Sequence, residues 1–363
     1  MRPRLWILLS IIVLTGCGSS PPGESHQKVG VLPGKVYEDI TCREYPAHSY
    51  AIYLPSTYIP GDSLPIFLAF DPAGSGATPV NLYKDIAEKY RFILIGSNNS
   101  RNGQGADQTQ QIIAILLSEI GKRYSIDPDR VYCTGFSGGS RVSSLMAFYG
   151  GGIKGVIGCG AGLPSTSTPL CFPTDYYGIV GDQDFNYMEM VGLATALSNQ
   201  NLRSTLHIFH GPHAWPPAEV FEAAVEWHWS NAMNDGMISP DQTIQVASQK
   251  DIQENSSMLK AIDLNALEKE RELQQHYAES IQRENLAWWQ NEAKKLEHPS
   301  NPADTLLNKR LMSYMSIMAY TYSNQALAGK SKEGLERMIG IYEIVDPENR
   351  YISYLKEQLN TLP

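Results

Sequence analysis

Short apolar segments alternate with longer amphipathic ones between residues 36 and 229, and this alternation restricts the fold more than any other feature. Several short segments are rich in β-branched and aromatic residues, which predicts strands: SYAIYLP, PIFLAF, FILIGSN, DRVYCTG, GVIGCG, DYYGIVG and TLHIFHG. Helices are predicted between or after them: NLYKDIAEKY, DQTQQIIAILLSEIGKRY, SGGSRVSSLMAFYG and AEVFEAAVEWHW. Strands alternating with helices predict an α/β fold, with a mostly parallel sheet covered by helices on both faces.

The pattern changes after residue 235, where Gly236 and Pro240 mark a break. Residues 236–363 have helical propensity and spacing and no convincing strand pattern, which predicts a separate C-terminal α-helical appendage. The segment GLERMIGIYEIVDPENRYISYLKEQL resembles a tetratricopeptide-type helix pair, but an array needs about three such units, so a small helical bundle is the alternative. We expect the appendage to be dispensable for the chemical step, with docking of a protein partner as its possible role.

The N-terminus, MRPRLWILLSIIVLTGCGSS, has two arginines followed by an apolar run over residues 5–14. This run is too short for a comfortable membrane span and predicts a secretory signal. Its ending LTGC resembles a bacterial lipobox, which implies that Cys17 is lipidated; a plain signal peptide with a chance cysteine is the alternative. We therefore expect a signal peptide over 1–17, a flexible tether over 18–34 and a lipoprotein anchored to a membrane of the bacterial cell envelope, on the periplasmic side or the cell surface.

Charge and cysteine content narrow the possible partners. The net charge of −9 and sequence pI of about 5.4 argue against a nucleic-acid-binding protein, which would carry a basic patch. No CxxC, HExxH or His/Asp cluster indicates a metal site. Cys133 belongs to a predicted buried strand and is expected to be a packed free thiol, whereas a disulfide between Cys159 and Cys171 stays open.

Ser137 lies in the string VYCTGFSGGSRVS, where a predicted buried strand runs into a predicted helix. Gly135 and Gly139 suit a sharp turn there, which predicts a nucleophile elbow. The wider string IDPDRVYCTGFSGGSR resembles the esterase/polyhydroxybutyrate-depolymerase-like branch of the α/β-hydrolase superfamily, over about residues 35–229. This resemblance implies an α/β-hydrolase domain at 35–235, followed by the appendage at 236–363.

A serine hydroxyl needs a base to remove its proton, and the base needs a carboxylate to orient it. In this fold the acid and then the histidine follow the serine in the chain. The loop after the last strand offers His210 and His213, and GPHAWPP resembles the family's HxWP ending, which favours His213. In GDQDFNY the family's spacing of glycine, two residues and acid favours Asp184, with Asp182 as the alternative.

Acyl transfer also needs N–H donors for the developing oxyanion. The backbone N–H of Gly138, directly after the serine, is the first. The second should come from DPAGSGA after the PIFLAF strand; Pro72 has no N–H, so Ala73 or Gly74 must supply it, and Ala73 is preferred. Many relatives have His-Gly where this chain has Asp71 and Pro72, so this loop departs from the family pattern.

Together these residues predict a membrane-anchored serine esterase that works through an acyl-enzyme, without a metal or organic cofactor. The substrate is a small-molecule or polysaccharide ester, and the resemblance implies acylated or feruloylated polysaccharide. Two alternatives remain. A serine peptidase of the same fold uses the same catalytic groups, and related folds also occur as non-catalytic binding proteins.

Overall fold

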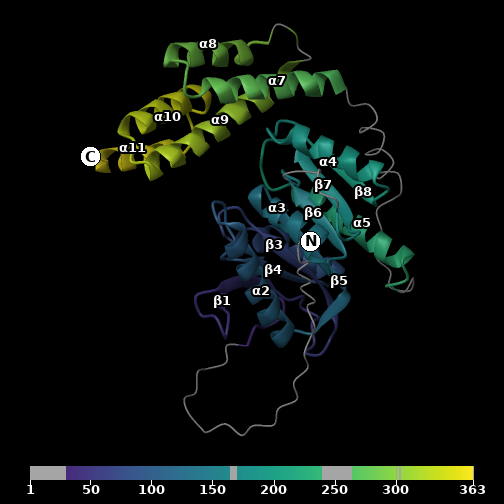
Figure 1. The fold of residues 1–363 in the computed structure, drawn as a ribbon. Helices are drawn as coiled ribbons and strands as arrows, with labels where there is room; N and C mark the ends of the chain where they lie inside the picture. The colour runs from purple at the N-terminus through teal and green to yellow at the C-terminus, as the bar shows by residue number, and fades with distance from the viewer. Residues whose placement is uncertain (1–29, 164–169, 239–263, 300, 302–303, 363) are drawn as a thin grey trace, which may run out of the picture. The chain divides into compact units, whose positions relative to one another are not determined.

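Eight strands form one sheet in the order β1-β2-β4-β3-β5-β6-β7-β8 (Figure 1). The strands β4, β3, β5, β6, β7 and β8 run parallel, while β2 runs antiparallel to β4 and β1 antiparallel to β2. Their bounds are Val36–Thr41, Ser49–Tyr53, Leu64–Phe70, Ile93–Ser97, Ile126–Phe136, Gly155–Cys159, Asp175–Gly181 and Ser204–Phe209 for β1 to β8. The chain therefore has the α/β-hydrolase fold, as the sequence predicts.

This computed structural model describes residues 30–163, 170–238, 264–299, 301 and 304–362. The predicted signal peptide, Cys17 and most of the predicted tether lie outside the described residues. Residues 32–363 form one compact unit. Within the described part of the chain, no helix combines the length and the apolar character that crossing a membrane requires.

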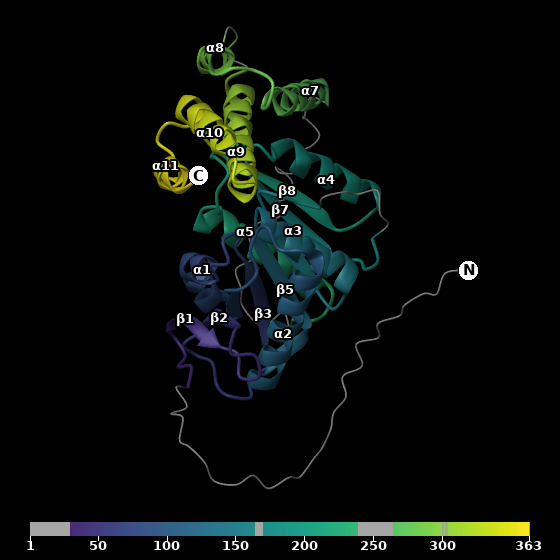
Figure 2. The same ribbon diagram turned by 60° about the vertical axis from the view of Figure 1, so that its left-hand side comes forward.

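Helices cover both faces of the sheet. On one face, α1 (Ala77–Tyr90) and α5 (Ala218–Asn234) pack against apolar side chains of the central strands. The opposite face carries α2 (Ala106–Arg123), α3 (Gly138–Leu145) and α4 (Tyr187–Asn199) (Figures 1 and 2). The apolar core under α1 and α5 includes stacked rings. The ring centroids of Phe67 and Tyr132 are 4.9 Å apart, and those of Tyr83 and Phe221 are 3.8 Å apart. Burial on both faces explains why the central strands read as continuous apolar runs.

Two elements have no counterpart in the sequence prediction. The edge strand β1 was missed because its sequence, VYEDIT, is partly exposed and carries two acidic residues. The helix α4 was missed because most of its residues are apolar or small, so the helical period is weak. The last turn predicted for α3 is instead a π-helical turn over Met146–Gly150.

Five helices follow the sheet and its covering helices in the described residues: α7 (Leu264–Ser280), α8 (Leu286–Glu297), α9 (Thr305–Ala328), α10 (Lys332–Val345) and α11 (Tyr351–Thr361). They share an apolar core of their own, which includes Trp289, Leu311, Met315, Leu335 and Leu355. No strand occurs beyond residue 238 in the part that the structure describes. The tetratricopeptide-like character of α10 and α11 stays a prediction.

The four described cysteines are all free thiols. Cys42, Cys133 and Cys159 are buried and Cys171 is exposed, so Cys133 is packed as predicted and the pairing of Cys159 with Cys171 is not formed. Burial raises the pKa of the Cys133 and Cys159 thiols, which keeps them protonated and unreactive at neutral pH.

Candidate active site

Ser137 occupies a sharp turn between β5 and α3. Its φ is 53°, which a residue with a Cβ rarely adopts, so the backbone is strained there. Glycines make room for the turn: a Cβ at Gly135 would lie 2.2 Å from the carbonyl oxygen of Gly139, and one at Gly139 would lie 1.9 Å from that of Phe70. The N–H of Ser137 donates to the Cys159 carbonyl over 2.8 Å. This is the backbone geometry of a nucleophile elbow.

Asp184 and His213 form a pair on the loops that follow β7 and β8, with the aspartate buried and the histidine partly buried. The Oδ2 of Asp184 lies 2.8 Å from Nδ1 of His213, and Oδ1 accepts the N–H of Asn186 over 2.8 Å. The side chain of Asp184 is 1% exposed and that of His213 is 16% exposed. Because the carboxylate accepts the Nδ1 proton, Nε2 is the imidazole nitrogen that can take up another one.

Two aromatic rings fix the plane of the imidazole. Phe136, at the end of β5, has its ring centroid 4.5 Å from that of His213. Phe185, beside the acid, has its centroid 4.3 Å away. Contact with two rings restricts rotation of His213 about its side-chain bonds, which reduces the orientational freedom of a base.

Gly160 lies beside two of the three predicted triad residues, and its neighbour Cys159 contacts the third. It follows β6 with a φ of 64°, and a Cβ there would lie 3.1 Å from Oδ2 of Asp184 and 3.2 Å from Cε1 of His213. The preceding residue, Cys159, accepts the N–H of Ser137. Thus the main chain of Ser137 and the side chains of Asp184 and His213 all lie next to the carboxyl end of β6, although the three residues come from three different loops.

A second aspartate and histidine pair lies on the same two loops. Nδ1 of His210 is 2.8 Å from Oδ2 of Asp182, while Oδ1 of Asp182 accepts the N–H of Gly211. The His210 side chain is 79% exposed, in contrast to that of His213. This pair connects the two loops at the surface, and its exposure indicates a structural role.

The oxyanion region differs in part from the sequence prediction. Gly138 is the first residue of α3, directly after Ser137, and its role as an oxyanion donor stays a prediction. The N–H of Ala73 donates to Oδ1 of Asp71 over 2.9 Å, and that of Gly74 donates to the carbonyl of Asp71. Ala73 would therefore have to exchange this partner for a substrate oxygen, and its role as second donor stays a prediction.

Asn102 is a side chain at this region that the sequence did not indicate. Its side-chain Oδ1 lies 1.8 Å from the position that a Cβ on Gly138 would take. Its main-chain N–H donates to the carbonyl of Pro72 over 2.8 Å. An exposed amide therefore lies against the residue that follows the nucleophile, where it can contact a bound substrate.

Asp71 also joins two loops, which are called below the oxyanion loop (residues 71–76, after β3) and the histidine loop (residues 210–217, after β8). Its Oδ2 accepts the indole N–H of Trp215 over 2.9 Å, and the carboxylate is 6% exposed. Sequence reasoning noted that Asp71 departs from the family pattern but did not find this partner. The tryptophan of GPHAWPP was the available signal, because a partly buried indole N–H usually finds an acceptor.

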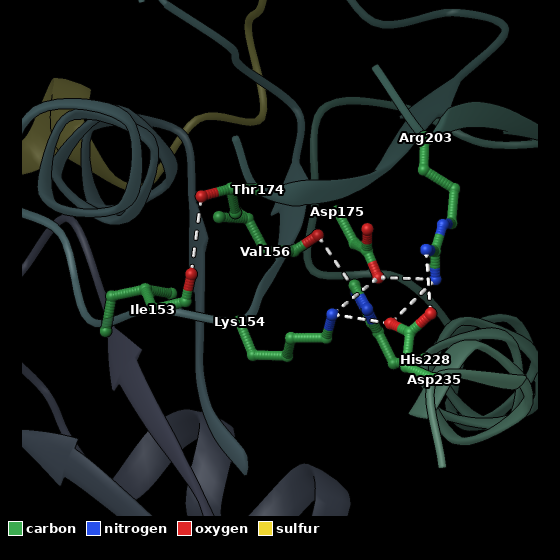
Figure 3. Close-up of polar contacts among 8 residues, drawn as sticks. All are labelled: Ile153, Lys154, Val156, Thr174, Asp175, Arg203, His228 and Asp235. Atoms are coloured by element: carbon green, nitrogen blue, oxygen red, sulfur yellow. Dashed lines mark hydrogen bonds and ion pairs between the residues drawn. The ribbon is translucent and has the colours of Figure 1, made fainter. Parts of the chain in front are cut away.

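A cluster of charged side chains lies at the opposite, amino edge of the parallel strands (Figure 3). Asp235 at the end of α5 is 2.7 Å from Nζ of Lys154 and 3.0 Å from Nη2 of Arg203, and Nη1 of Arg203 is 3.4 Å from Asp175. The hydrogen bonds from Arg203 and Lys154 lower the pKa of Asp235 to about 2.

His228 lies beside this cluster but is fully buried. Its Nε2 is 3.2 Å from the carbonyl oxygen of Val156 (Figure 3). A Cβ at Gly155 would lie 2.4 Å from Cε1 of the imidazole. Burial lowers the pKa of His228 to about 3, so the ring is neutral at physiological pH. Its location in a packed interior indicates a structural role.

The described residues contain no group of three or more His, Cys, Asp or Glu side chains able to hold a metal ion. The residues at the carboxyl edge of the sheet combine a hydroxyl, an imidazole and a buried carboxylate, which are groups able to carry out nucleophilic chemistry with proton transfer.

No protein-family model and no curated protein matched the chain. Solved structures did. The fluorophosphonate-binding serine hydrolase F of Staphylococcus aureus, with substrate bound, is 13% identical at a TM-score of 0.43, covering 54% of this chain and 98% of its own. A ferulic acid esterase is 14% identical at 0.43, covering 53% and 95%. An inhibited esterase B from Lactobacillus rhamnosis is 14% identical at 0.46, covering 56% and 90%.

Proposed function

We propose that this protein is a serine hydrolase that cleaves carboxylic esters through an acyl-enzyme on Ser137. The observation that carries the proposal is the convergence at Gly160 of a strained serine turn and a buried carboxylate–imidazole pair. A serine in an ordinary loop requires neither the strain nor the pair, whereas a nucleophile requires both.

In the proposed mechanism Oγ of Ser137 attacks the ester carbonyl carbon while Nε2 of His213 takes the hydroxyl proton. Asp184 accepts a hydrogen bond from Nδ1–H and stabilises the imidazolium that forms. The N–H of Gly138 donates to the developing oxyanion, with Ala73 proposed as the second donor. His213 then passes its proton to the departing alkoxide, and the ester C–O bond breaks. A water molecule, deprotonated by the same imidazole, releases the acid and restores Ser137.

Labelling with a fluorophosphonate probe tests the nucleophile directly. The wild-type protein should bind the probe covalently at Ser137, and Ser137→Ala should not. A wild-type protein that neither takes up the probe nor hydrolyses any short ester would be a non-catalytic binding protein, and the proposal would fail.

Profiling short esters against peptide amides separates the esterase from a serine peptidase of the same fold. We propose esters as the substrate class and, from the sequence resemblance alone, acylated or feruloylated polysaccharide as their source. Preferential cleavage of peptide amides would identify the peptidase instead, with the same three residues in the same roles.

We also propose that Cys17 carries a lipid anchor, because LTGC follows an apolar run with positive charge before it. Cys17→Ala should release the protein from the membrane fraction of the bacterial cell envelope. A wild-type protein found wholly outside that fraction would refute anchoring without affecting the catalytic proposal.

A further inference from the structure

The loop over residues 182–186, called the acid loop below, carries Asp184 and is contacted by the C-terminal helices. Two main-chain carbonyl groups of this loop accept hydrogen bonds from helical side chains. Nη1 of Arg310 donates to the carbonyl of Asp182 over 3.0 Å, and Nε2 of Gln274 donates to that of Phe185 over 3.2 Å. The two contacts therefore hold the acid loop on either side of the catalytic carboxylate.

Arg310 is itself rigidly held. Its guanidinium forms a two-pronged ion pair with Glu270, with Nε 2.9 Å from Oε1 and Nη2 2.8 Å from Oε2. The side chain of Glu270 is fully buried and that of Arg310 is 11% exposed. The guanidinium carbon also lies 4.4 Å from the ring centroid of Tyr187, the residue that follows the acid loop. Because Nε and Nη2 of Arg310 are bound to the Glu270 carboxylate, Nη1 is held in one orientation toward the carbonyl of Asp182.

One side of α7 supplies most of these groups. Leu267, Glu270 and Gln274 are spaced by three and four residues and so share one face of the helix. Leu267 packs against an apolar cluster that includes Val180 and Leu206, from the strands that lead into the two catalytic loops. The polar contacts are thus flanked by an apolar one, and together they fix α7 against the end of β7.

A buried ion pair is a costly way to join two helical surfaces, because apolar side chains of similar volume often stabilise as well or better. The Glu270–Arg310 pair also has a second effect. It leaves one guanidinium N–H directed at the main-chain carbonyl of the residue two positions before Asp184. Phe185, whose carbonyl accepts from Gln274, packs its ring against that of His213 in a tilted arrangement. Both contacts therefore act on groups that fix the Asp184–His213 geometry.

We propose that Arg310 and Gln274 are positioning residues, through which the C-terminal helices hold the acid loop in its catalytic conformation. The proposal rests on the proposed function of Ser137, Asp184 and His213. It replaces the sequence expectation that residues 236–363 are dispensable for the chemical step. Small displacements of a catalytic group reduce turnover strongly, so loss of these contacts should lower kcat by about 10- to 100-fold.

The first test removes the contact to Asp182 in the full-length protein while keeping the helices packed. Glu270→Leu combined with Arg310→Met replaces both charges by apolar side chains of similar size, so no buried charge is left unpaired. We expect a lower kcat for a small ester, an unchanged KM and an unchanged extent of fluorophosphonate labelling at saturation. Gln274→Leu should act in the same direction.

Matched controls lie within the C-terminal helices, one on α10 and one on α7. Arg337 in α10 donates to the carbonyls of Ile281 and Glu284 within the helical region, and Gln275 donates to Glu279 on α7. Arg337→Met and Gln275→Leu should therefore keep kcat within about twofold of wild type, because neither touches the acid loop. If Arg337→Met lowers kcat as much as the paired variant, the effect is one of helical stability and the proposal fails.

A double-mutant cycle distinguishes positioning from a general structural effect. If Arg310 and Gln274 act through the acid, their replacement should lower kcat by less than about twofold in an Asp184→Ala background. An equal reduction in both backgrounds would overturn the proposal, as would no reduction in the wild-type background. If the paired variant does not fold, the same cycle with Gln274→Leu decides. Failure of the proposed function is seen separately, as a wild-type protein that does not label at Ser137.

Discussion

The two edges of the parallel sheet carry the same kinds of side chain but arrange them differently. At the carboxyl edge a buried aspartate pairs with one nitrogen of His213 and leaves the other nitrogen for proton transfer. At the amino edge Asp175 and Asp235 face two cations, and His228 is sealed in the interior as a neutral ring (Figure 3).

This difference shows that residue type alone does not identify a catalytic group. At the amino edge the charges are paired and the histidine is buried, so these groups stabilise the packing of the strands against α5. At the carboxyl edge the hydroxyl of Ser137, on a strained backbone, and Nε2 of His213 remain available for a substrate. Active sites in open α/β sheets lie at this edge, where the loops after the strands meet.

The largest expected effect concerns the nucleophile and base at the carboxyl edge. Ser137→Ala and His213→Ala should each lower kcat for a short ester by about 10⁴- to 10⁶-fold, because the two groups act as a unit. For the same reason the double variant should be little worse than either single one. Full activity of Ser137→Ala would contradict the assignment of the site.

The next effect separates the two aspartate–histidine pairs. Asp184→Ala should lower kcat by about one or two decades less than His213→Ala does, since the imidazole loses its orientation but remains present. Asp182→Ala and His210→Ala should stay within about tenfold of wild type, a barrier change near 1.4 kcal/mol. An inactive His210→Ala with an active His213→Ala would move the base to the exposed pair.

A smaller effect is expected at the contact between the oxyanion loop and the histidine loop. Trp215→Phe leaves the buried carboxylate of Asp71 without its indole donor, which should lower the free energy of unfolding by about 1–3 kcal/mol and kcat by about tenfold. Urea unfolding and ester kinetics measure the two quantities. As a control, Trp289→Phe in α8 removes an indole whose N–H has no partner in the described residues, so it should leave kcat unchanged.

The smallest effect on turnover is expected at the amino edge, where the readout is stability against pH. The pKa of His228 falls from 6.5 to about 3 on folding, so the unfolded chain takes up a proton first as the pH drops. The contribution of neutral His228 to the free energy of unfolding is complete above pH 6.5 and is lost as the pH falls toward 3. Between pH 7 and 5 the loss is about 2 kcal/mol of unfolding free energy.

His228→Gln should remove this acid sensitivity while keeping a donor for Val156 and leaving kcat unchanged. His298→Gln, at an exposed position, should change neither quantity. Urea unfolding at the two pH values measures the difference. An equal acid loss in wild type and His228→Gln would show that His228 does not titrate in this way.

Much of this architecture could be predicted from local patterns. The strands around Ser137, Asp184 and His213 are strongly apolar, and each residue follows a strand end, so the order of elements brings them to one edge. The contact of Asp71 with Trp215 and that of Arg310 with the acid loop join segments 144 and 128 residues apart. No local period encodes such contacts. The weak period of α4 and the exposed edge strand β1 were missed for the opposite reason, because their local patterns are faint.

The positive φ of Ser137 sets stability and activity against each other. A strained backbone of this kind costs about 1–3 kcal/mol, and glycine adopts it without the steric penalty. Ser137→Gly should therefore unfold at a higher temperature than the wild-type protein while lacking the proposed nucleophile. Engineering that selects this protein for thermal resistance alone would favour loss of the Ser137 hydroxyl, so such a screen should also measure the proposed ester turnover.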